Sequence, residues 1–225
     1  MATSKIVGEV KSTMLGRSHR HWTPRYVVDR LQLMFYARSH PDVPWLCRDA
    51  IEILNCWLKP TDRGFEWGSG RSTLWLAQRV SHLTSVEHDE AWAHKVTEKL
   101  RANGAAHRVD YHLAPDGKEE RFDSQYVGIV HELRPGVLDF CLVDGVSRDH
   151  CALACLDKLK PGGIIIIDNV ERYVPRVPKS PGPEARTMEQ GPASRMWGRF
   201  VQATAEWRCI WTTNNVWDTA VWFKP

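Results

Sequence analysis

The sequence predicts an α/β fold in which one doubly wound, mostly parallel sheet carries helices on both faces. Short apolar strands alternate with helical stretches from Thr61 to Asn169, and the turns between them are brief. The aliphatic run from Ile164 to Ile167 is typical of a strand that is buried on both faces. The chain has 225 residues, of which 43% are apolar, and this suits one large domain with added segments.

Each element of this alternation is placed by its own residues. A strand that ends at Phe65-Glu66 leads into a helix over residues 72–80. Residues 83–87 form the next strand, and the helix after it stops at Asn103-Gly104. Three further strands are expected over residues 108–113, 137–143 and 164–167, and a helix carrying Cys151, Cys155 and Leu159 precedes the last of them.

The two ends of the chain depart from the alternation. Residues 1–59 are interpreted as an N-terminal arm and helical cap, with helices over 26–36 and 45–58, ahead of a domain over residues 60–225. Residues 208–213 and 219–223 predict a closing antiparallel hairpin, which brings the sheet to seven strands. Between these parts, residues 170–195 hold five of the 13 prolines, and this segment is either a lid or substrate loop or a disordered insertion.

Composition excludes several classes of protein. A net charge of +3 is too small to indicate nucleic-acid binding on its own. No apolar run approaches the roughly 20 residues that a membrane helix needs, and no leader is visible, so we expect a cytoplasmic protein without a membrane partner. The six cysteines include no Cys-x-x-Cys pair, which favours reduced core thiols over a disulfide or metal set.

The first candidate site is the turn from Glu66 to Ser72, where a strand opens into a helix. Gly68 and Gly70 let the backbone turn tightly beside a ligand, and the helix start offers unpaired N–H groups. The carboxylate of Glu66 disfavours a pyrophosphate here and favours the ammonium group of an amino-acid-like ligand. The third glycine of the dinucleotide fingerprint is absent.

The second candidate is Glu87, which ends the next strand 21 residues after Glu66. An acidic side chain at this distance can accept hydrogen bonds from both hydroxyls of a ribose. The alternative is a solvated carboxylate at a helix start, because Asp89 and Glu90 follow in a first turn where acids are favoured.

With these two motifs, residues 60–225 resemble the class I S-adenosylmethionine-dependent methyltransferases, whose Rossmann-like sheet also ends in an antiparallel strand. The resemblance implies S-adenosylmethionine as cofactor, with its methionine part against the loop and its ribose on Glu87. His88 would then lie against the adenine, and Ala114 at its edge would match by position only, as part of Ala114-Pro115-Asp116. The cofactor-binding residues expected on this basis are Glu66, Gly68, Ser69, Gly70, Ser72, Glu87, His88, Ala114 and Asp144.

Acidic and amide side chains follow the fourth and fifth strands. Asp144, Asp168 and Asn169 would meet at the carboxyl edge of the sheet, where oxygen ligands suit Mg²⁺. In this the chain resembles the metal-dependent small-molecule O-methyltransferases. In the other interpretation, Asp144 faces the cofactor and Asp168-Asn169 caps the following segment.

The catalytic pair proposed from the sequence is His150 with Asp144. The catechol-type enzymes carry a Lys three residues after the first metal-binding Asp, whereas Ser147 stands here. His150 is then the natural general base, since its ordinary pKa lies near neutrality. The alternative is that His150 and Asp149 only provide polarity at a helix start.

The resemblance implies methyl transfer to a hydroxyl oxygen of a small molecule. The competing functions are an NAD-dependent oxidoreductase and a non-catalytic Rossmann-like interaction module. Nucleic acid is not expected as substrate, because Asp144-Gly145-Val146-Ser147 stands where DNA methyltransferases carry a Pro-Pro-Tyr motif. Residues 1–30 carry six Lys or Arg against two acids, and residues 170–200 carry six against three, which predicts an anionic acceptor. The expected acceptor contacts are Tyr173, Arg176, Arg186 and Trp197, and the cap is expected to pair in a homodimer.

Overall fold

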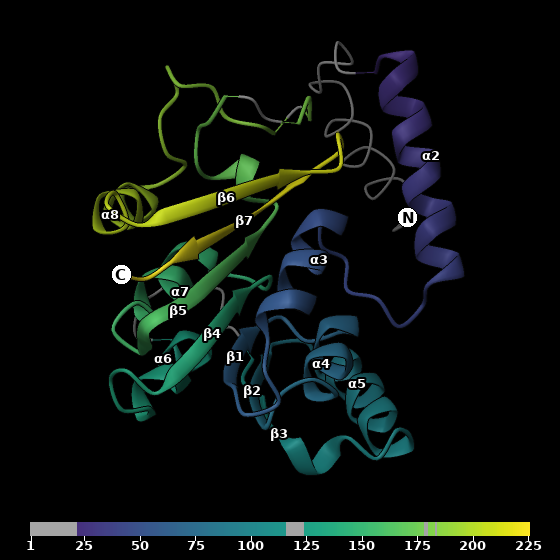
Figure 1. Cartoon of the computed structure of the whole chain (residues 1–225), viewed down its shortest axis with the longest axis vertical. Coiled ribbons are helices and arrows are strands. Elements are labelled where there is room, and N and C mark those ends of the chain that lie inside the picture. The colour runs from purple at the N-terminus through teal and green to yellow at the C-terminus, as the bar shows by residue number, and fades with distance from the viewer. Residues whose placement is uncertain (1–21, 116–123, 178–179, 183) are drawn as a thin grey trace, which may run out of the picture.

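A single mixed sheet organises the chain, and its strand order is β3-β2-β1-β4-β5-β7-β6 (Figure 1). The computed structural model describes residues 22–115, 124–177, 180–182 and 184–225, and the seven strands lie within them. The strands are β1 (Arg63–Trp67), β2 (His82–Glu87), β3 (Val109–Leu113), β4 (Leu138–Val143), β5 (Leu159–Asp168), β6 (Arg208–Thr213) and β7 (Asp218–Phe223). The predicted fold class is therefore confirmed.

The pairing of the strands places the functional edge of the sheet. β1 pairs in parallel with β2 on one side and with β4 on the other, so the chain reverses its winding direction between β1 and β4. β5 continues the parallel set, whereas β7 is antiparallel to both β5 and β6. Open α/β sheets bind ligands beyond the carboxyl ends of the strands at such a switch point.

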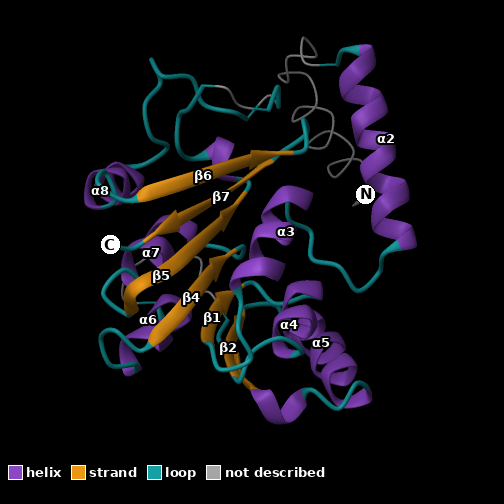
Figure 2. Cartoon of the chain, in the orientation of Figure 1, coloured by secondary structure: helices purple, strands orange, loops and turns teal. Residues whose placement is uncertain are grey.

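Helices cover both faces of the sheet (Figure 2). α3, α4 and α5 lie on one face, and α6, α7 and α8 on the other. The helices are α2 (Pro24–Ser39), α3 (Arg48–Trp57), α4 (Arg71–Ala77), α5 (Glu90–Ala102), α6 (Gln125–Gly128), α7 (Arg148–Ala154) and α8 (Arg195–Ala203), with short 3₁₀ turns η2 (Ala106–Arg108), η3 (Ile129–Glu132) and η4 (Val170–Arg172). None of the described helices is long and apolar enough to span a bilayer.

The N-terminal helices occur where the sequence predicts them, as α2 and α3. α2 begins after Thr23, whose hydroxyl accepts a hydrogen bond from the Tyr26 amide. Tyr26 is the buried residue of this helix, and α2 stands apart from the sheet in Figure 1. Residues 1–21 of the expected arm lie outside the described residues, and the division at residue 59 stays a prediction.

One expectation for the second half of the chain is wrong, and one helix was not expected. The helix expected to reach Leu159 ends at Ala154, and Leu159 begins β5. The amides of Val137 and Leu138 both donate to the Lys158 carbonyl at 2.9 Å, so the chain is already joined to the start of β4 at this point. Residues 195–203, to which the sequence analysis assigned no helix or strand, form the helix α8.

Candidate functional site

The loop after β1 lies against the loop after β4. Gly68 has φ +88°, and a Cβ there would lie 2.6 Å from the Gly145 nitrogen, so only glycine fits. The Asp144 amide donates to the Trp67 carbonyl at 2.9 Å and fixes the two strand ends together. Gly70 has an extended backbone, and a Cβ there would approach nothing closer than the Trp92 ring at 3.9 Å.

Glu66 is fully buried beneath this loop. Its carboxylate accepts hydrogen bonds from the hydroxyls of Ser72 at 3.0 Å and Ser85 at 2.7 Å. Burial raises the pKa of Glu66 to about 7, although the hydroxyl donors oppose the shift. The predicted loop residues Glu66 and Ser72 therefore form one buried polar cluster with Ser85.

Glu87 ends β2 and points its carboxylate at the same loop. One oxygen accepts from the amide of Ser69 at 3.0 Å and from its hydroxyl at 2.9 Å. The other accepts from the amides of His88 at 2.8 Å and Asp89 at 3.0 Å, and lies 2.9 Å from His88 Nδ1. The structure thus brings Glu87, Ser69 and His88 together.

Aromatic residues that the sequence did not single out complete this half of the site. The Trp92 indole donates to the Ser69 carbonyl at 2.7 Å, and the Tyr111 hydroxyl lies 2.6 Å from Ser69 Oγ. The Tyr126 ring meets His88 edge-on, with centroids 5.9 Å apart. Trp92 could have been found from its place one turn into the helix after Glu87, whereas Tyr126 carries no local signal.

Ala114 lies at the same end of the sheet and is fully buried. Its amide donates to the Glu87 carbonyl at 2.8 Å. Asp116 of the same motif lies outside the described residues.

This half of the site fits S-adenosylmethionine. A carboxylate has about four lone-pair positions, and in Glu87 they are shared among five partners: three backbone amides and the side chains of Ser69 and His88. The two hydroxyls of a ribose are donors of the same kind as these two side chains. They would replace the side chains and leave the backbone amides in place.

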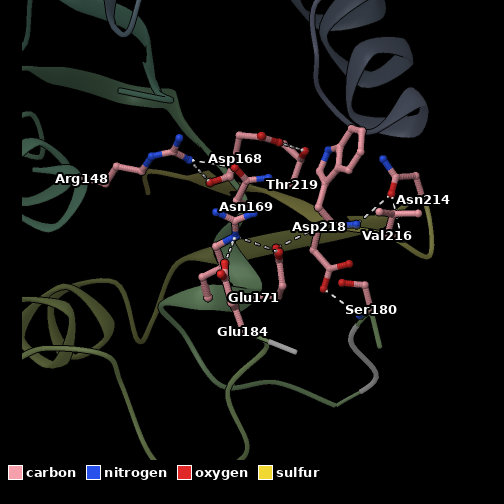
Figure 3. Close-up of polar contacts among 12 residues, drawn as sticks. Arg148, Asp168, Asn169, Glu171, Ser180, Glu184, Asn214, Val216, Asp218 and Thr219 are labelled. Atoms are coloured by element: carbon pink, nitrogen blue, oxygen red, sulfur yellow. Dashed lines mark hydrogen bonds and ion pairs between the residues drawn. The ribbon is translucent and has the colours of Figure 1, made fainter. Parts of the chain in front are cut away.

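The other half of the site is built around the guanidinium of Arg148. Its Nη2 donates to the Asp144 carbonyl at 2.9 Å and pairs with Asp144 Oδ1 at 2.9 Å. Its Nε donates to the Gly145 carbonyl at 2.8 Å, and its Nη1 to the Asp168 carbonyl at 2.6 Å and Asn169 Oδ1 at 3.5 Å. Figure 3 shows the guanidinium reaching the end of β5.

The three residues expected to hold Mg²⁺ therefore meet, but around a side-chain cation. The carboxylate of Asp168 accepts from the Thr219 hydroxyl, while its backbone carbonyl faces Arg148. Within the described ranges, no group of three or more His, Cys, Asp or Glu side chains is placed to bind a metal ion. The donor set does not fit a divalent cation while the guanidinium lies within it.

Two residues with left-handed backbone shape this edge. Ser147 has φ 47° just before α7, and Asn169 has φ 51° just before η4. Such values are uncommon for residues other than glycine and cluster at functional sites. They turn the chain sharply after β4 and β5, so that Arg148 and Asn169 face each other.

His150 is held by a carboxylate. Its Nδ1 lies 3.0 Å from Asp149 Oδ1, and the other oxygen of Asp149 accepts from the Ser194 hydroxyl at 2.6 Å. Ser194 also caps α8, by accepting from the Trp197 amide. A carboxylate that fixes one ring nitrogen orients the imidazole, which is the arrangement of an oriented base.

The four predicted acceptor contacts lie in different surroundings. Tyr173 stacks on Trp197 with centroids 5.0 Å apart, and Trp197 is 2% exposed, so Trp197 packs in the core behind Tyr173. Arg186 donates to the carbonyls of Gln190 and Gly191 and closes its own loop. Arg176 is exposed and lies over the Trp211 ring at 5.3 Å.

Arg176 also borders a cavity among the described residues. This cavity has a volume of about 490 Å³, within the range of small-molecule pockets. It lies between the segment after η4, α8 and β6, and its aromatic wall consists of Trp207, Trp211 and Trp222.

Comparisons with known proteins agree with this fold. Residues 65–170 match a family described as "Methyltransferase domain". No curated protein matched the chain. Similar solved structures include the O-methyltransferase TomG from Streptomyces achromogenes, crystallised with S-adenosylmethionine, at 19% identity and a TM-score of 0.53, with all of both chains covered.

Two other solved structures share the fold. A putative caffeoyl-CoA O-methyltransferase from Staphylococcus aureus has 16% identity and a TM-score of 0.57, with 98% of each chain covered. An O-methyltransferase from Bacillus cereus in complex with SAH has 13% identity and a TM-score of 0.56, with 98% of this chain and 97% of that chain covered. The chain is therefore similar to a methyltransferase domain over residues 65–170 and shares the fold of these solved O-methyltransferases.

Proposed function

We propose that this chain transfers a methyl group from S-adenosylmethionine to a hydroxyl oxygen of a small molecule. The observation that carries the proposal is the carboxylate of Glu87, held by backbone amides at the end of β2 against the glycine loop of β1. The O-methyltransferases of the same fold support the choice of oxygen as acceptor. Bound S-adenosylmethionine would supply an electrophilic methyl group on a sulfonium.

The residues of this chain have separate tasks in that reaction. Glu87 would bind the ribose, and the loop from Glu66 to Ser72 would hold the methionine part, where Glu66 would favour an ammonium group. Asp144 lies across this loop, and its carboxylate is fixed by Arg148. Such a site acts mainly by holding the methyl donor and the methyl acceptor in line and by excluding water from them.

We assign the removal of the acceptor proton to His150. The imidazole is oriented by Asp149, which is itself anchored by Ser194 at the start of α8. A base placed in this way takes the proton as the oxygen attacks, so that the hydroxyl becomes a better nucleophile. No step is assigned to a metal ion, because Arg148 lies among the expected ligands.

We propose an anionic aromatic acceptor. The cavity bordered by Arg176 offers indole rings for an aromatic body and one guanidinium for a carboxylate or phosphate. Tyr173 and Arg176 are the acceptor contacts that we retain from the sequence, since Trp197 is a core residue and Arg186 braces its loop. Nucleic acid is not part of the proposal.

We also propose a cytoplasmic homodimer. The six cysteines are free thiols, and Cys141, Cys151 and Cys155 are buried, as expected for a protein kept in a reducing compartment. The exposed apolar face of α2 is the surface that would form the dimer.

Calorimetry with S-adenosylhomocysteine tests the cofactor assignment. The wild-type chain is expected to bind it, and Glu87→Ala is expected to weaken binding by about 10- to 100-fold, because hydrogen bonds to a charged group contribute about 1.5–3 kcal/mol. Glu90→Ala is the matched control, since Glu90 is exposed in the first turn of α5. Tight binding of NADH without S-adenosylhomocysteine would support an oxidoreductase, and binding of neither would support a non-catalytic module.

Methyl transfer to a panel of carboxylate-bearing phenols tests the acceptor side. With methyl-labelled S-adenosylmethionine, His150→Gln is expected to lower kcat, and Arg176→Gln to raise the acceptor KM. Both variants should keep the wild-type affinity for S-adenosylhomocysteine. A normal kcat in His150→Gln would remove His150 from the role of base, and an unchanged KM in Arg176→Gln would contradict the anionic acceptor.

A further inference from the structure

The acceptor set around Arg148 has the chemistry of a cation site. It consists of three backbone carbonyls, one carboxylate oxygen and one amide oxygen, all at the carboxyl ends of β4 and β5. Hard divalent cations in proteins bind carboxylate, carbonyl and amide oxygens of this kind. The position therefore attracts a positive charge, and the chain supplies one of its own.

We propose that the guanidinium of Arg148 takes the place of a divalent cation, so that methyl transfer by this chain requires no metal ion. This inference rests on the proposed function, because it concerns the same site.

Charge favours the guanidinium over a divalent ion. Of the five oxygens, only Asp144 Oδ1 belongs to a carboxylate, and it meets a single positive charge at 2.9 Å. The carboxylate of Asp168 is engaged by the Thr219 hydroxyl. A divalent cation in the same place would leave a surplus positive charge in a largely buried site, which is unfavourable.

Geometry also favours the guanidinium. Arginine carries five N–H donors in a fixed fork, and the structure provides five oxygen partners for them. The Arg148 side chain is only 14% exposed, and its guanidinium carbon lies 5.9 Å from the centre of the Tyr173 ring. Such a fixed cation is not readily displaced by a weakly held ion.

These contacts define what Arg148 does in the reaction. Because its donors are engaged by the protein, Arg148 does not bind the acceptor oxygen. It is a positioning residue that holds Asp144 beside the glycine loop and joins the ends of β4 and β5. Activation of the hydroxyl is then left to His150 and Asp149.

The first part of the test uses the full-length chain after treatment with a chelating resin. Mn²⁺ is titrated in and followed by electron paramagnetic resonance, with and without S-adenosylhomocysteine. The wild-type chain is expected to bind no Mn²⁺ at this site, and its methyl transfer is expected to be unchanged by EDTA. Stoichiometric Mn²⁺ binding, with turnover lost in EDTA and restored by Mg²⁺, would overturn the proposal.

The second part opens the site by Arg148→Ala. Its melting temperature is expected to fall, because the carboxylate of Asp144 loses its partner. Mn²⁺ or Mg²⁺ is then expected to bind and to recover part of the loss, whereas Arg148→Lys should gain no Mn²⁺ binding because it keeps a cation. A merely structural arginine would lower stability without creating an Mn²⁺ site, and that result would contradict the proposal.

Lys160→Ala is the matched control. Lys160 of β5 pairs with Asp139 of β4 at 2.7 Å, at the opposite end of the same two strands. Its loss should lower stability without creating an Mn²⁺ site. If Arg148→Ala does not fold, the wild-type titration and Arg148→Lys still decide the question.

Binding of S-adenosylhomocysteine separates the two levels of inference. If the chain binds S-adenosylhomocysteine but needs a metal ion for methyl transfer, only the role proposed for Arg148 is refuted. A chain that does not bind S-adenosylhomocysteine would refute the proposed function.

Discussion

Glu66 and Glu87 lie at the ends of neighbouring strands, but their carboxylates have different hydrogen-bond donors around them. Glu87 accepts hydrogen bonds from three backbone amides, which are fixed donors that stabilise a carboxylate. Glu66 is fully buried and is contacted by hydroxyl groups, which can rotate to serve either protonation state. Burial accordingly raises the pKa of Glu66 to about 7. Near neutral pH a cationic ligand group above Glu66 would favour its ionised form.

The raised pKa of Glu66 predicts a pH-dependent stability. The ordinary value is 4.5, so between pH 4.5 and about 7 the folded chain holds a proton that the unfolded chain has lost. Stability therefore falls as pH rises through this window, by roughly 3 kcal/mol in total from this group. In Glu66→Gln this contribution is absent, so the stability of the variant relative to wild type should increase from pH 5 to pH 7 and then level off.

Urea unfolding of both chains at several pH values measures this difference. Glu98→Gln is the control, because the Glu98 side chain on α5 is 62% exposed, and it should follow the wild-type pH curve. A constant stability difference between wild type and Glu66→Gln across the window would contradict the assignment.

At the scale of residues, the sequence could place a side chain whose position follows from its own strand or loop. Glu66 and Glu87 could be predicted because both end strands, and parallel strands bring such ends to one edge of a sheet. The role of Arg148 could not be predicted. The i,i+4 spacing to Asp144 was visible, but the contacts with Asp168 and Asn169 depend on how β5 ends and on the left-handed turn at Asn169.

At the scale of elements, the β1–α4 loop contains two glycines, Gly68 and Gly70, with different roles. Gly68→Ala is expected to lower the free energy of unfolding by about 2–3 kcal/mol, because it adds a Cβ at positive φ against the backbone of Gly145. Gly70→Ala is expected to cost no more than about 1 kcal/mol, since the position is extended, has space and precedes a helix.

Urea unfolding and calorimetry with S-adenosylhomocysteine distinguish the two roles. Gly70→Ala should fold well yet bind the ligand more weakly, because the added Cβ takes up space in the loop assigned to the cofactor, 3.9 Å from the Trp92 ring. Equal loss of stability in both variants would show that the loop conformation has been misread, and wild-type affinity in Gly70→Ala would place the cofactor elsewhere.

Elements with a repeated apolar period were predictable, and those set by distant partners were not. α8 was missed because its signal is short: Ser194 caps a helix in which Trp197 and Phe200 are the buried residues. Leu159 was assigned to a helix because its spacing from Cys151 and Cys155 is helical. Hydrogen bonds from Val137 and Leu138 to Lys158 draw this segment into the sheet instead.

At the scale of the whole molecule, the two halves of the site come from the two sides of the switch point. β1 and β2 supply the two carboxylates that we assign to the cofactor, whereas β4 and β5 supply the set around Arg148. We assign the acceptor side to the segment after η4 and to α8, which Tyr173 and Trp197 link by stacking. Both halves join residues that are far apart in sequence: Tyr111 meets Ser69 across 42 residues, and Ser194 meets Asp149 across 45.

The helix α2 belongs to neither half of the site. Its contacts with the rest of the chain include Arg71, which donates to the carbonyls of Ala37 and His40, and Arg48, which lies over the Tyr36 ring. Large apolar side chains along the helix remain exposed, namely Val28 (50%), Leu31 (47%), Met34 (44%) and Phe35 (67%). Leu31 and Phe35 are four residues apart and share one face of the helix.

The homodimer expected from the sequence would use this face. Exposed apolar patches of this kind mark interaction sites, and a two-fold axis would let the same face meet itself. Light scattering coupled to size-exclusion chromatography should give the mass of two chains for wild type and of one chain for Leu31→Asp/Phe35→Asp. Met188→Asp is the control, because Met188 is exposed at 64% on the loop before α8 and should leave the mass unchanged. A wild-type mass of one chain, or a double variant that still has the mass of two, would show that α2 faces something other than a second copy.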